Sequence, residues 1–367
     1  MSSDRTAIKL LLTGGGTGGH LFPAIAAAEE LLARMPQAEV MFVGTRRKMD
    51  SSSLSHYGFR VESVYCYGLK GKNLVSLIKA LAALPVALVQ AARLIRSFRP
   101  DVVLGVGGYV TGPVIAAARL LGKKTVIHEQ NSIPGLANRA LRIMVDRICI
   151  SLPGSAIYFP GDKTVLTGNP VRSPIRELAA ASLPDTVAKT KTLVVLGGSQ
   201  GAHRLNELVG EAICDHGAGA DCRVIHQTGE TDCLNVRQRY HEHGINAQVE
   251  AFFRDMAAVY GQADLVISRA GATTLAELAI LGLPAILVPY PHAADDHQQE
   301  NARHYVDGGG CRAFKEKELD GRKLAAEMKG LLADDASRHV MAVNMRKLGH
   351  LEAAAKIVDV CQAAVAS

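Results

Sequence analysis

The sequence predicts an α/β protein made of two Rossmann-like, doubly wound domains that face a central cleft. Three observations predict this class. Apolar strand patterns alternate with helical patterns along the chain, two glycine-rich turns each follow an apolar strand, and 367 residues suffice for two domains with separate cores.

The two glycine-rich turns are the most informative of these features. The first reads GGGTGGH at residues 14–20 and follows an apolar run at 8–12; the second reads GGSQGA at 197–202 and follows a run at 193–196. Glycine lets the backbone approach a bound group closely, and the helix that follows offers free N–H groups to an anion. One such turn is a weak signal, but two, half a chain apart, indicate two ligand-binding domains.

Strand patterns recur in both halves of the chain. They lie at residues 8–12, 40–43, 102–106, 125–128 and 147–150, and again at 193–196, 224–226, 249–252, 265–268 and 285–288. The segment GNPVRSP at 168–174 contains two prolines and a glycine and is the best interdomain linker. The expected domains are residues 1–170 and 171–349, with the C-terminal helical tail, 350–367, packing back on the first.

Composition excludes several classes of protein. With 48% hydrophobic and 21% charged residues, the chain is an ordinary soluble globular protein. A net charge of +6 fits anionic ligands or an anionic membrane surface, and no basic motif indicates nucleic acid. Seven cysteines without a Cys-x-x-Cys pair predict reduced thiols in the cytosol, and neither a signal peptide nor an apolar membrane span is present.

The stretch Leu74–Phe98 combines apolar residues with positive charge. No acidic residue occurs between Ser63 and Pro100, whereas six basic residues do: Lys70, Lys72, Lys79, Arg93, Arg96 and Arg99. One interpretation is a buried helix pair, broken near Pro85, with a solvated basic edge. The other is a patch that rests on anionic lipid.

Nucleotide recognition is indicated more strongly than a dinucleotide cofactor. The residues GTRRK at 44–48 lack the acidic residue that holds the ribose of NAD, although their basic side chains leave NADP open. The segment SRAGATTLAE at 268–277 begins a helix with small residues that leave N–H groups open to a diphosphate, and Glu277 could bond both ribose hydroxyls. The alternative is an ordinary helix start with a solvent-facing glutamate. Arg172 could neutralise a phosphate, or be a surface charge.

No metal or cofactor is expected. Asp295, Asp296 and His297 could ligate a metal, but the chain nowhere contains the Asp-x-Asp spacing that metal-dependent sugar-nucleotide transferases use. Polar loops at 107–113 and 128–131 end two strands of the first half beside the expected cleft, where ligand contact is favoured.

Read together, these segments resemble the MurG-type glycosyltransferases of peptidoglycan synthesis. The similarity runs from about residue 10 to residue 302 and is carried, in order, by 15–20 with 22–24, 107–109, 128–131 with 135–138, 168–172, 197–202 and 271–277. The resemblance implies a GT-B fold and transfer of N-acetylglucosamine from UDP-N-acetylglucosamine to the C4 hydroxyl of the muramyl sugar of undecaprenyl-linked lipid I, giving lipid II. It implies a peripheral protein on the cytoplasmic face of the cell (inner) membrane; protein partners stay unknown.

The resemblance also implies site residues. The donor-binding positions are Thr17, Gly18, Gly19, Asn131, Arg172, Ser199, Gln200, Phe253, Ala272, Thr273, Thr274, Leu275, Ala276, Glu277 and Gln298. Among them the Phe253 backbone would read the uracil edge, and Gln298, or its neighbour Gln299, would contact the sugar. Tyr109 and Asn138 are the acceptor-binding positions.

An α-linked donor and one direct displacement would give a β-linked product, so the acceptor hydroxyl needs a general base. His20 is the first candidate and Glu129 the second; alternatively, His20 only positions the acceptor diphosphate. Rival functions are a UDP-N-acetylglucosamine 2-epimerase or hydrolase of the same fold, an NADP oxidoreductase and a non-catalytic nucleotide-sugar-binding regulator.

Overall fold

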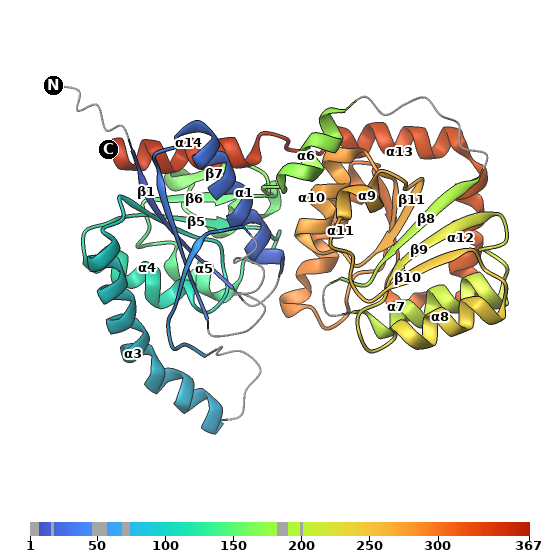
Figure 1. Ribbon diagram of the computed structural model, residues 1–367, viewed down its shortest axis with the longest axis horizontal. Coiled ribbons are helices and arrows are strands. Elements are labelled where there is room, and N and C mark those ends of the chain that lie inside the picture. The colour runs from blue at the N-terminus through green and yellow to red at the C-terminus, as the bar shows by residue number, and fades with distance from the viewer. Residues whose placement is uncertain (1–6, 16–17, 46–56, 68–73, 182–189, 199–200) are drawn as a thin grey trace. The chain divides into compact units, whose positions relative to one another are not determined.

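The computed structural model describes residues 7–15, 18–45, 57–67, 74–181, 190–198 and 201–367. The chain divides into two compact units (Figure 1). Unit 1 comprises residues 1–172 and 350–367, and unit 2 comprises residues 173–349. The boundary falls two residues beyond the expected one, inside the predicted linker, so Arg172 belongs to unit 1.

Unit 1 is built on a parallel sheet of seven strands in the order β3-β2-β1-β4-β5-β6-β7. The strands are β1 Lys9–Thr13, β2 Glu39–Gly44, β3 Arg60–Ser63, β4 Val102–Gly105, β5 Lys124–Glu129, β6 Arg147–Ile150 and β7 Thr164–Leu166. In register, Leu11 of β1 lies between Met41 of β2 and Val103 of β4. The strand order reverses between β1 and β4, which is where α/β sheets of this kind bind ligands.

Helices cover both faces of this sheet. They are α1 Gly18–Arg34, α3 Leu74–Phe98, α4 Thr111–Leu120, α5 Leu136–Leu141, α14 Ala353–Ala366 and the short helices η1 Pro153–Tyr158 and η2 Gly161–Lys163. Side chains alternate along β1: Leu10 and Leu12 share a core with Ile25 of α1 and Ile357 of α14. Leu11 belongs to the opposite core with Ile95 of α3 and Ile115 of α4. The C-terminal helix therefore completes one face of unit 1.

The expectation of a helix pair around Pro85 is wrong, because α3 is one continuous helix. Its inner side is a stripe of small and apolar residues at helical spacing, Ala83, Ala87, Ala91 and Ile95, all buried. A proline inside a helix removes one hydrogen bond at a cost of about 3 kcal/mol. Pro85 itself is exposed. Packing along the inner stripe offsets the lost bond, so the helix continues.

Unit 2 repeats the architecture with a six-stranded parallel sheet in the order β10-β9-β8-β11-β12-β13. The strands are β8 Lys191–Leu196, β9 Cys222–Gln227, β10 Ala247–Glu250, β11 Leu265–Ser268, β12 Ala285–Leu287 and β13 Cys311–Ala313. The helices are α6 Ser173–Ala180, α7 His203–Gly210, α8 Cys233–Glu242, α9 Met256–Tyr260, α10 Ala272–Leu281, α11 His297–Asp307, α12 Gly321–Ala333 and α13 Asp335–Lys347, with short η3 Glu211–Asp215, η4 Ala294–Asp296 and η5 Glu316–Glu318.

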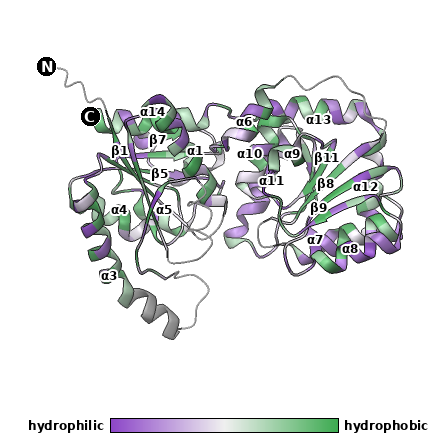
Figure 2. Ribbon diagram, in the orientation of Figure 1, coloured by the Kyte–Doolittle hydropathy of each residue, from purple (hydrophilic) through white to green (hydrophobic). Residues whose placement is uncertain are grey.

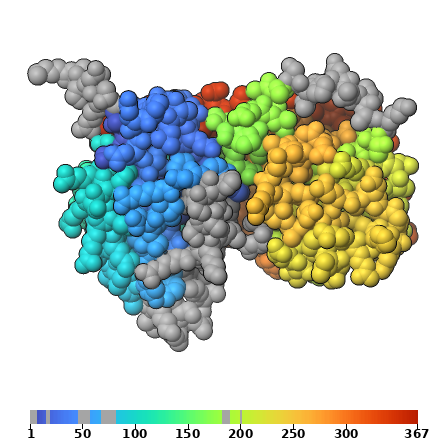
Figure 3. Space-filling model, viewed as in Figure 1, coloured from blue at the N-terminus to red at the C-terminus, as the bar shows by residue number. Residues whose placement is uncertain are grey.

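The core of unit 2 joins its strands to α7 and α12. Leu193 of β8 packs in one cluster with Leu208 of α7 and Met328 of α12. Figure 2 shows hydrophobic residues along β8 and β9, whereas α8 is largely hydrophilic. In the space-filling view α8 lies at the surface of its unit (Figure 3), as its many exposed side chains require.

All ten strands predicted from the sequence are present, with ends that differ by no more than two residues from the prediction. Three short strands were not predicted: β3, β7 and β13. Each lies at an edge of its sheet and so has one strand neighbour. An edge strand needs no continuous apolar run, and Val165 and Leu166 of β7 are indeed exposed.

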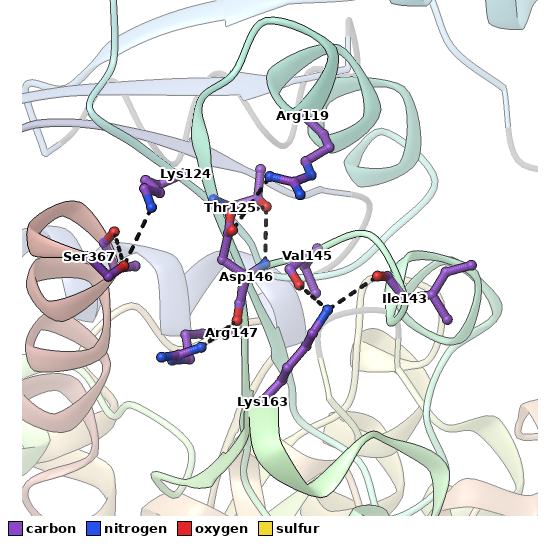
Figure 4. Close-up of polar contacts among 10 residues, drawn as sticks. Arg119, Lys124, Thr125, Ile143, Val145, Asp146, Arg147, Lys163 and Ser367 are labelled. Atoms are coloured by element: carbon purple, nitrogen blue, oxygen red, sulfur yellow. Dashed lines mark hydrogen bonds and ion pairs between the residues drawn. The ribbon is translucent and has the colours of Figure 1, made fainter.

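Aspartates fix the amino ends of neighbouring strands. Asp146, just before β6, accepts hydrogen bonds at Oδ2 from the Thr125 N–H at 2.8 Å and the Thr125 hydroxyl at 2.9 Å (Figure 4). Asp101 before β4 accepts from the N–H of Lys9, and Asp264 before β11 from that of Thr192. The same device thus sets strand pairing in both units.

Candidate functional site

In unit 1 the candidate site lies at the carboxyl ends of β1, β4 and β5. The loops after β1 and β4 touch: a Cβ on Gly108 would lie 2.5 Å from the carbonyl oxygen of Gly15. Gly107 and Gly108 both have positive φ, at +99° and +81°, so only glycine fits this contact. His20, in the first turn of α1, is brought against Gly107.

His20 is held by a network of buried polar groups. Its Nδ1 lies 3.1 Å from Oε1 of Gln130, the residue directly after β5. Nε2 of Gln130 donates to the Val106 carbonyl at 2.8 Å and lies 3.1 Å from Nδ1 of His128. His128 is fully buried, and this burial lowers its pKa to about 4, so it stays neutral near pH 7.

The Glu129 carboxylate accepts hydrogen bonds from the segment that follows it in the chain. Its side chain is buried, at 1% exposure. Oε1 accepts from the N–H of Asn131 at 2.9 Å and from its Nδ2 at 3.2 Å, while Oε2 accepts from the N–H of Gly135 at 3.0 Å and from Nδ2 of Asn138 at 2.8 Å. A carboxylate that holds these donors is a loop anchor, and the arrangement favours His20 over Glu129 as a base.

The remaining residues predicted in unit 1 fall into three groups. Asn131 and Asn138 lie beside Glu129, but Asn138 is buried and its Nδ2 donates inward. Tyr109 follows β4, and the Arg172 guanidinium lies over the Phe22 ring at 4.2 Å from its centroid. Gly18 and Gly19 begin α1, whereas Thr17 lies outside the described residues.

In unit 2 the candidate anion-binding position is the start of α10. Ala272, Thr273, Thr274, Leu275, Ala276 and Glu277 form its first turns after Gly271. The residue that precedes the helix is Gly271, which has no side chain to cap it, and a helix N-terminus favours an anion.

Glu277 is buried at 4% exposure, and its Oε2 accepts from the Tyr260 hydroxyl at 2.9 Å. The alternative of a solvent-facing glutamate is therefore wrong.

Gln227 is a site residue that sequence reasoning missed. At the end of β9, its Nε2 donates to the carbonyl of Gly198 in the second glycine turn at 3.2 Å. Its Oε1 accepts from the N–H of Phe253 at 3.0 Å. The N–H of Phe253 already donates to Gln227, so the backbone group of Phe253 that can bind a nucleobase is its carbonyl. Ser199 and Gln200 lie outside the described residues.

A second missed residue, Arg269, holds the loop after β12. Its Nη1 donates to the Val288 carbonyl at 3.1 Å, and its Nη2 lies 2.6 Å from Oε2 of Glu316. The N–H of Tyr290 in this loop donates to Oε1 of Gln298, in the first turn of α11, at 2.9 Å. The only sequence signal for Arg269 was its place directly after an apolar strand.

The acidic residues of this loop do not form a metal centre in the described parts of the chain. No group of three or more His, Cys, Asp or Glu side chains is arranged there to hold an ion. Asp295 and Asp296 both adopt the left-handed conformation, with φ of 56° and 54°.

The fold and the two strand-end sites define a class. The glycosyltransferase family 28 N-terminal domain matches residues 10–150, and the family 28 C-terminal domain matches residues 192–359. The chain belongs to glycosyltransferase family 28, and its two parallel-sheet units are those of a two-domain GT-B fold.

Relatives of high sequence identity carry the name of one particular enzyme. The chain is 55% identical over 356 residues, 96% of each chain, to the UDP-N-acetylglucosamine--N-acetylmuramyl-(pentapeptide) pyrophosphoryl-undecaprenol N-acetylglucosamine transferase of Desulfotalea psychrophila. It is 46% identical to the enzyme of that name from Geobacter sulfurreducens, over 96% of this chain and 97% of the relative.

Solved structures agree with the two-domain GT-B fold. The crystal structure of Acinetobacter baumannii MurG matches with a TM-score of 0.76 and 30% identity, over 97% of this chain and 99% of that one. A UDP-GlcNAc 2-epimerase from Neisseria meningitidis matches at 14% identity with a TM-score of 0.69, over 97% of this chain and 100% of that one, and at that identity shares only the fold.

We expect Glu129→Gln to lower stability rather than to abolish only the chemistry. The new amide nitrogen would face donors that now bind a carboxylate oxygen, and each such bond contributes about 1.5–3 kcal/mol. Thermal unfolding should show a reduced melting temperature. A variant as stable as the parent that has lost kcat would instead support Glu129 as the base.

Proposed function

We propose that this protein transfers N-acetylglucosamine from UDP-N-acetylglucosamine to the C4 hydroxyl of the N-acetylmuramyl sugar of lipid I, forming lipid II. The proposal is supported by full-length relatives of that activity and by the start of α10, a helix N-terminus of the kind that binds a diphosphate. The epimerase alternative has support from fold likeness alone.

Unit 2 is proposed to hold the donor. The N–H groups of α10 would bind the diphosphate, since a helix N-terminus favours an anion. Glu277, one turn along the same helix, would accept hydrogen bonds from the ribose hydroxyls. The Phe253 carbonyl would accept from the N–H of uracil, and Gln298 or Gln299 would contact the sugar.

Unit 1 is proposed to supply the acceptor side and the base. His20 would take the proton of the acceptor hydroxyl while its oxygen bonds to the anomeric carbon of the donor. The bond from that carbon to the diphosphate oxygen breaks, and UDP leaves with the electron pair. One such displacement inverts the α-linkage to β. Tyr109 and Asn131 would lie near the reactants, while Glu129 and Asn138 hold the loop.

The α3 surface is proposed to rest on an anionic membrane at the cytoplasmic face. Val86 and Val89 are 48% and 51% exposed, and the exposed Arg93 and Arg96 continue the same side of the helix. Tyr65, whose N–H donates to Gln90 of α3, adds an exposed aromatic ring beside it. Among the described residues no helix is long and apolar enough to cross a bilayer.

One assay separates the candidate functions. Purified protein is incubated with labelled UDP-N-acetylglucosamine, with and without a lipid I analogue. A labelled lipid product that forms only with the acceptor supports the transferase. An epimerised or hydrolysed sugar nucleotide formed without acceptor overturns it, and NADP-dependent turnover would indicate an oxidoreductase.

Replacing Glu277 with Ala should weaken donor binding and leave the fold intact. Hydrogen bonds to a charged group contribute about 1.5–3 kcal/mol, which corresponds to an affinity loss of about ten- to a hundredfold. Calorimetric titration with UDP-N-acetylglucosamine measures the change. Tyr260→Phe, which removes only the partner hydroxyl, is the matched control, and unchanged affinity in Glu277→Ala removes this residue from the site.

His20→Ala should lower kcat by about 10²–10⁴-fold, the usual contribution of a positioned base. UDP affinity should stay within about threefold of the parent, because the proposed donor contacts lie mostly in unit 2. Steady-state kinetics in both substrates tests this. A change confined to the acceptor KM would assign His20 a positioning role only.

Transfer should proceed without a divalent cation. The sequence lacks Asp-x-Asp, and the N–H groups of α10 can stabilise the leaving diphosphate. Turnover should therefore be the same in EDTA as in its absence. Activity lost in EDTA and restored by magnesium would contradict the expectation.

Binding to anionic vesicles should weaken when Lys72, Lys79, Arg93 and Arg96 are replaced by Gln, because each basic residue near such a surface contributes about 1 kcal/mol. Added salt should weaken it too. Lys72 and the side chain of Lys79 lie outside the described parts of the chain.

The matched control for this variant changes exposed basic residues of unit 2 to Gln: Arg303, Lys317, Arg322 and Lys329. Sedimentation with vesicles compares the two variants. Equal co-sedimentation of the α3 variant and the parent would place the membrane contact elsewhere.

A further inference from the structure

The Gln130 side chain can face its neighbours in only one orientation. One end of its amide lies 2.8 Å from the carbonyl oxygen of Val106, a group that only accepts hydrogen bonds. The amide nitrogen must therefore occupy that end. The amide oxygen, Oε1, is then the atom that lies 3.1 Å from Nδ1 of His20.

This orientation decides where His20 carries its proton. An amide oxygen accepts and never donates, so the Nδ1 of His20 must be the donor. A neutral imidazole has one N–H, and its lone pair for accepting a proton then lies on Nε2.

We propose that Gln130 is a positioning residue that fixes the Nδ1–H tautomer of His20 and so keeps Nε2 as the proton acceptor of the transfer reaction. The inference rests on the proposed role of His20 as base. When Nε2 takes the hydroxyl proton, the imidazolium keeps its Nδ1–H on Oε1 of Gln130, so no hydrogen bond in the network has to change.

His128 secures the other hydrogen of the Gln130 amide. That N–H points to Nδ1 of His128 at 3.1 Å, so the His128 proton lies on Nε2, which donates to the Gly168 carbonyl at 3.2 Å. Protonation of Nδ1 would set two donors against each other. Burial also lowers the pKa of His128 to about 4, so His128 brings no second positive charge when His20 becomes cationic.

Gly107 lies beside the hydrogen bond between His20 and Gln130, since a Cβ at Gly107 would lie 3.6 Å from Oε1 of Gln130, and it restricts the His20 ring. A Cβ at this position would lie 2.9 Å from both Nδ1 and Cε1 of His20. The ring thus packs directly on the backbone after β4, and Gln130 meets a ring held in one place.

The tautomer of the unmodified protein is the first test. Ring ¹⁵N shifts of ¹⁵N-histidine-labelled protein are measured at about pH 8, above the ordinary histidine pKa of about 6.5, with His20→Ala to assign the signal. We expect protonated Nδ1 and unprotonated Nε2 at His20. The reverse pattern overturns the inference, and this readout does not depend on any Gln130 variant folding.

Two substitutions test the effect on turnover. Gln130→Met keeps the length of the side chain but cannot accept, so His20 should populate both tautomers, and kcat should fall by about ten- to a hundredfold, part of what a base contributes. The donor KM should stay within about threefold. Gln130→Glu keeps an acceptor facing Nδ1 and should retain the Nδ1–H signal, while its second oxygen replaces the donor to the Val106 carbonyl and should lower the melting temperature.

Gln362→Met, on α14, is the control for losing a glutamine amide elsewhere in unit 1, and it should leave kcat unchanged. If His20→Ala keeps its kcat, the proposed base is wrong. If His20→Ala loses kcat while Gln130→Met keeps both kcat and the Nδ1–H signal, the inference about Gln130 is wrong and the proposed base stands.

Discussion

Backbone groups at the carboxyl edge of each sheet, buried or half-buried, are the constraint on which both candidate sites depend. Where a parallel strand ends, the ladder stops, yet N–H and carbonyl groups of the next loop that are shielded from water need partners. Amide and carboxylate side chains from neighbouring strand ends supply them. Gln130 donates to Val106, Glu129 accepts from Gly135, and Gln227 joins Gly198 to Phe253. These polar side chains therefore stabilise the loops that form the candidate sites.

Hydrogen-bond partners distinguish two residues that the sequence alone presents as equal candidates for the base. Glu129 is the last residue of β5 and His20 lies in the first turn of α1, and both are plausible bases by residue type. The Glu129 carboxylate accepts from three donors of the loop that follows it and from Asn138 of α5, whereas the contact of His20 with Gln130 uses one of its two ring nitrogens. A residue that stabilises a loop and the residue proposed as the base can therefore both lie near strand ends, and their hydrogen-bond partners distinguish them.

The sequence predicted the central strands well because those strands are buried on both faces and read as continuous apolar runs. The edge strands β3, β7 and β13 carry no such run and were missed. The sequence predicted those parts of the candidate site that a local motif identifies, for example the small residues before Glu277. Its tertiary partners were not predicted: Tyr260 comes from α9, and Gln227 links two loops from separate strands. The periodicity of the sequence does not reveal such pairs, because they form only when helices and strands pack together.

The aspartates at the amino ends of the strands carry a consequence for how the chain finds its register. In a parallel sheet, sliding one strand by a single residue turns every inward side chain outward. Asp101, Asp146 and Asp264 each precede one strand and bond the first residues of its neighbour, across separations of 92, 21 and 72 residues. A slipped pairing would leave each carboxylate opposite no N–H. These three contacts therefore stabilise the native register of the strands. They favour it from the first hydrogen bond that forms between segments far apart in the sequence.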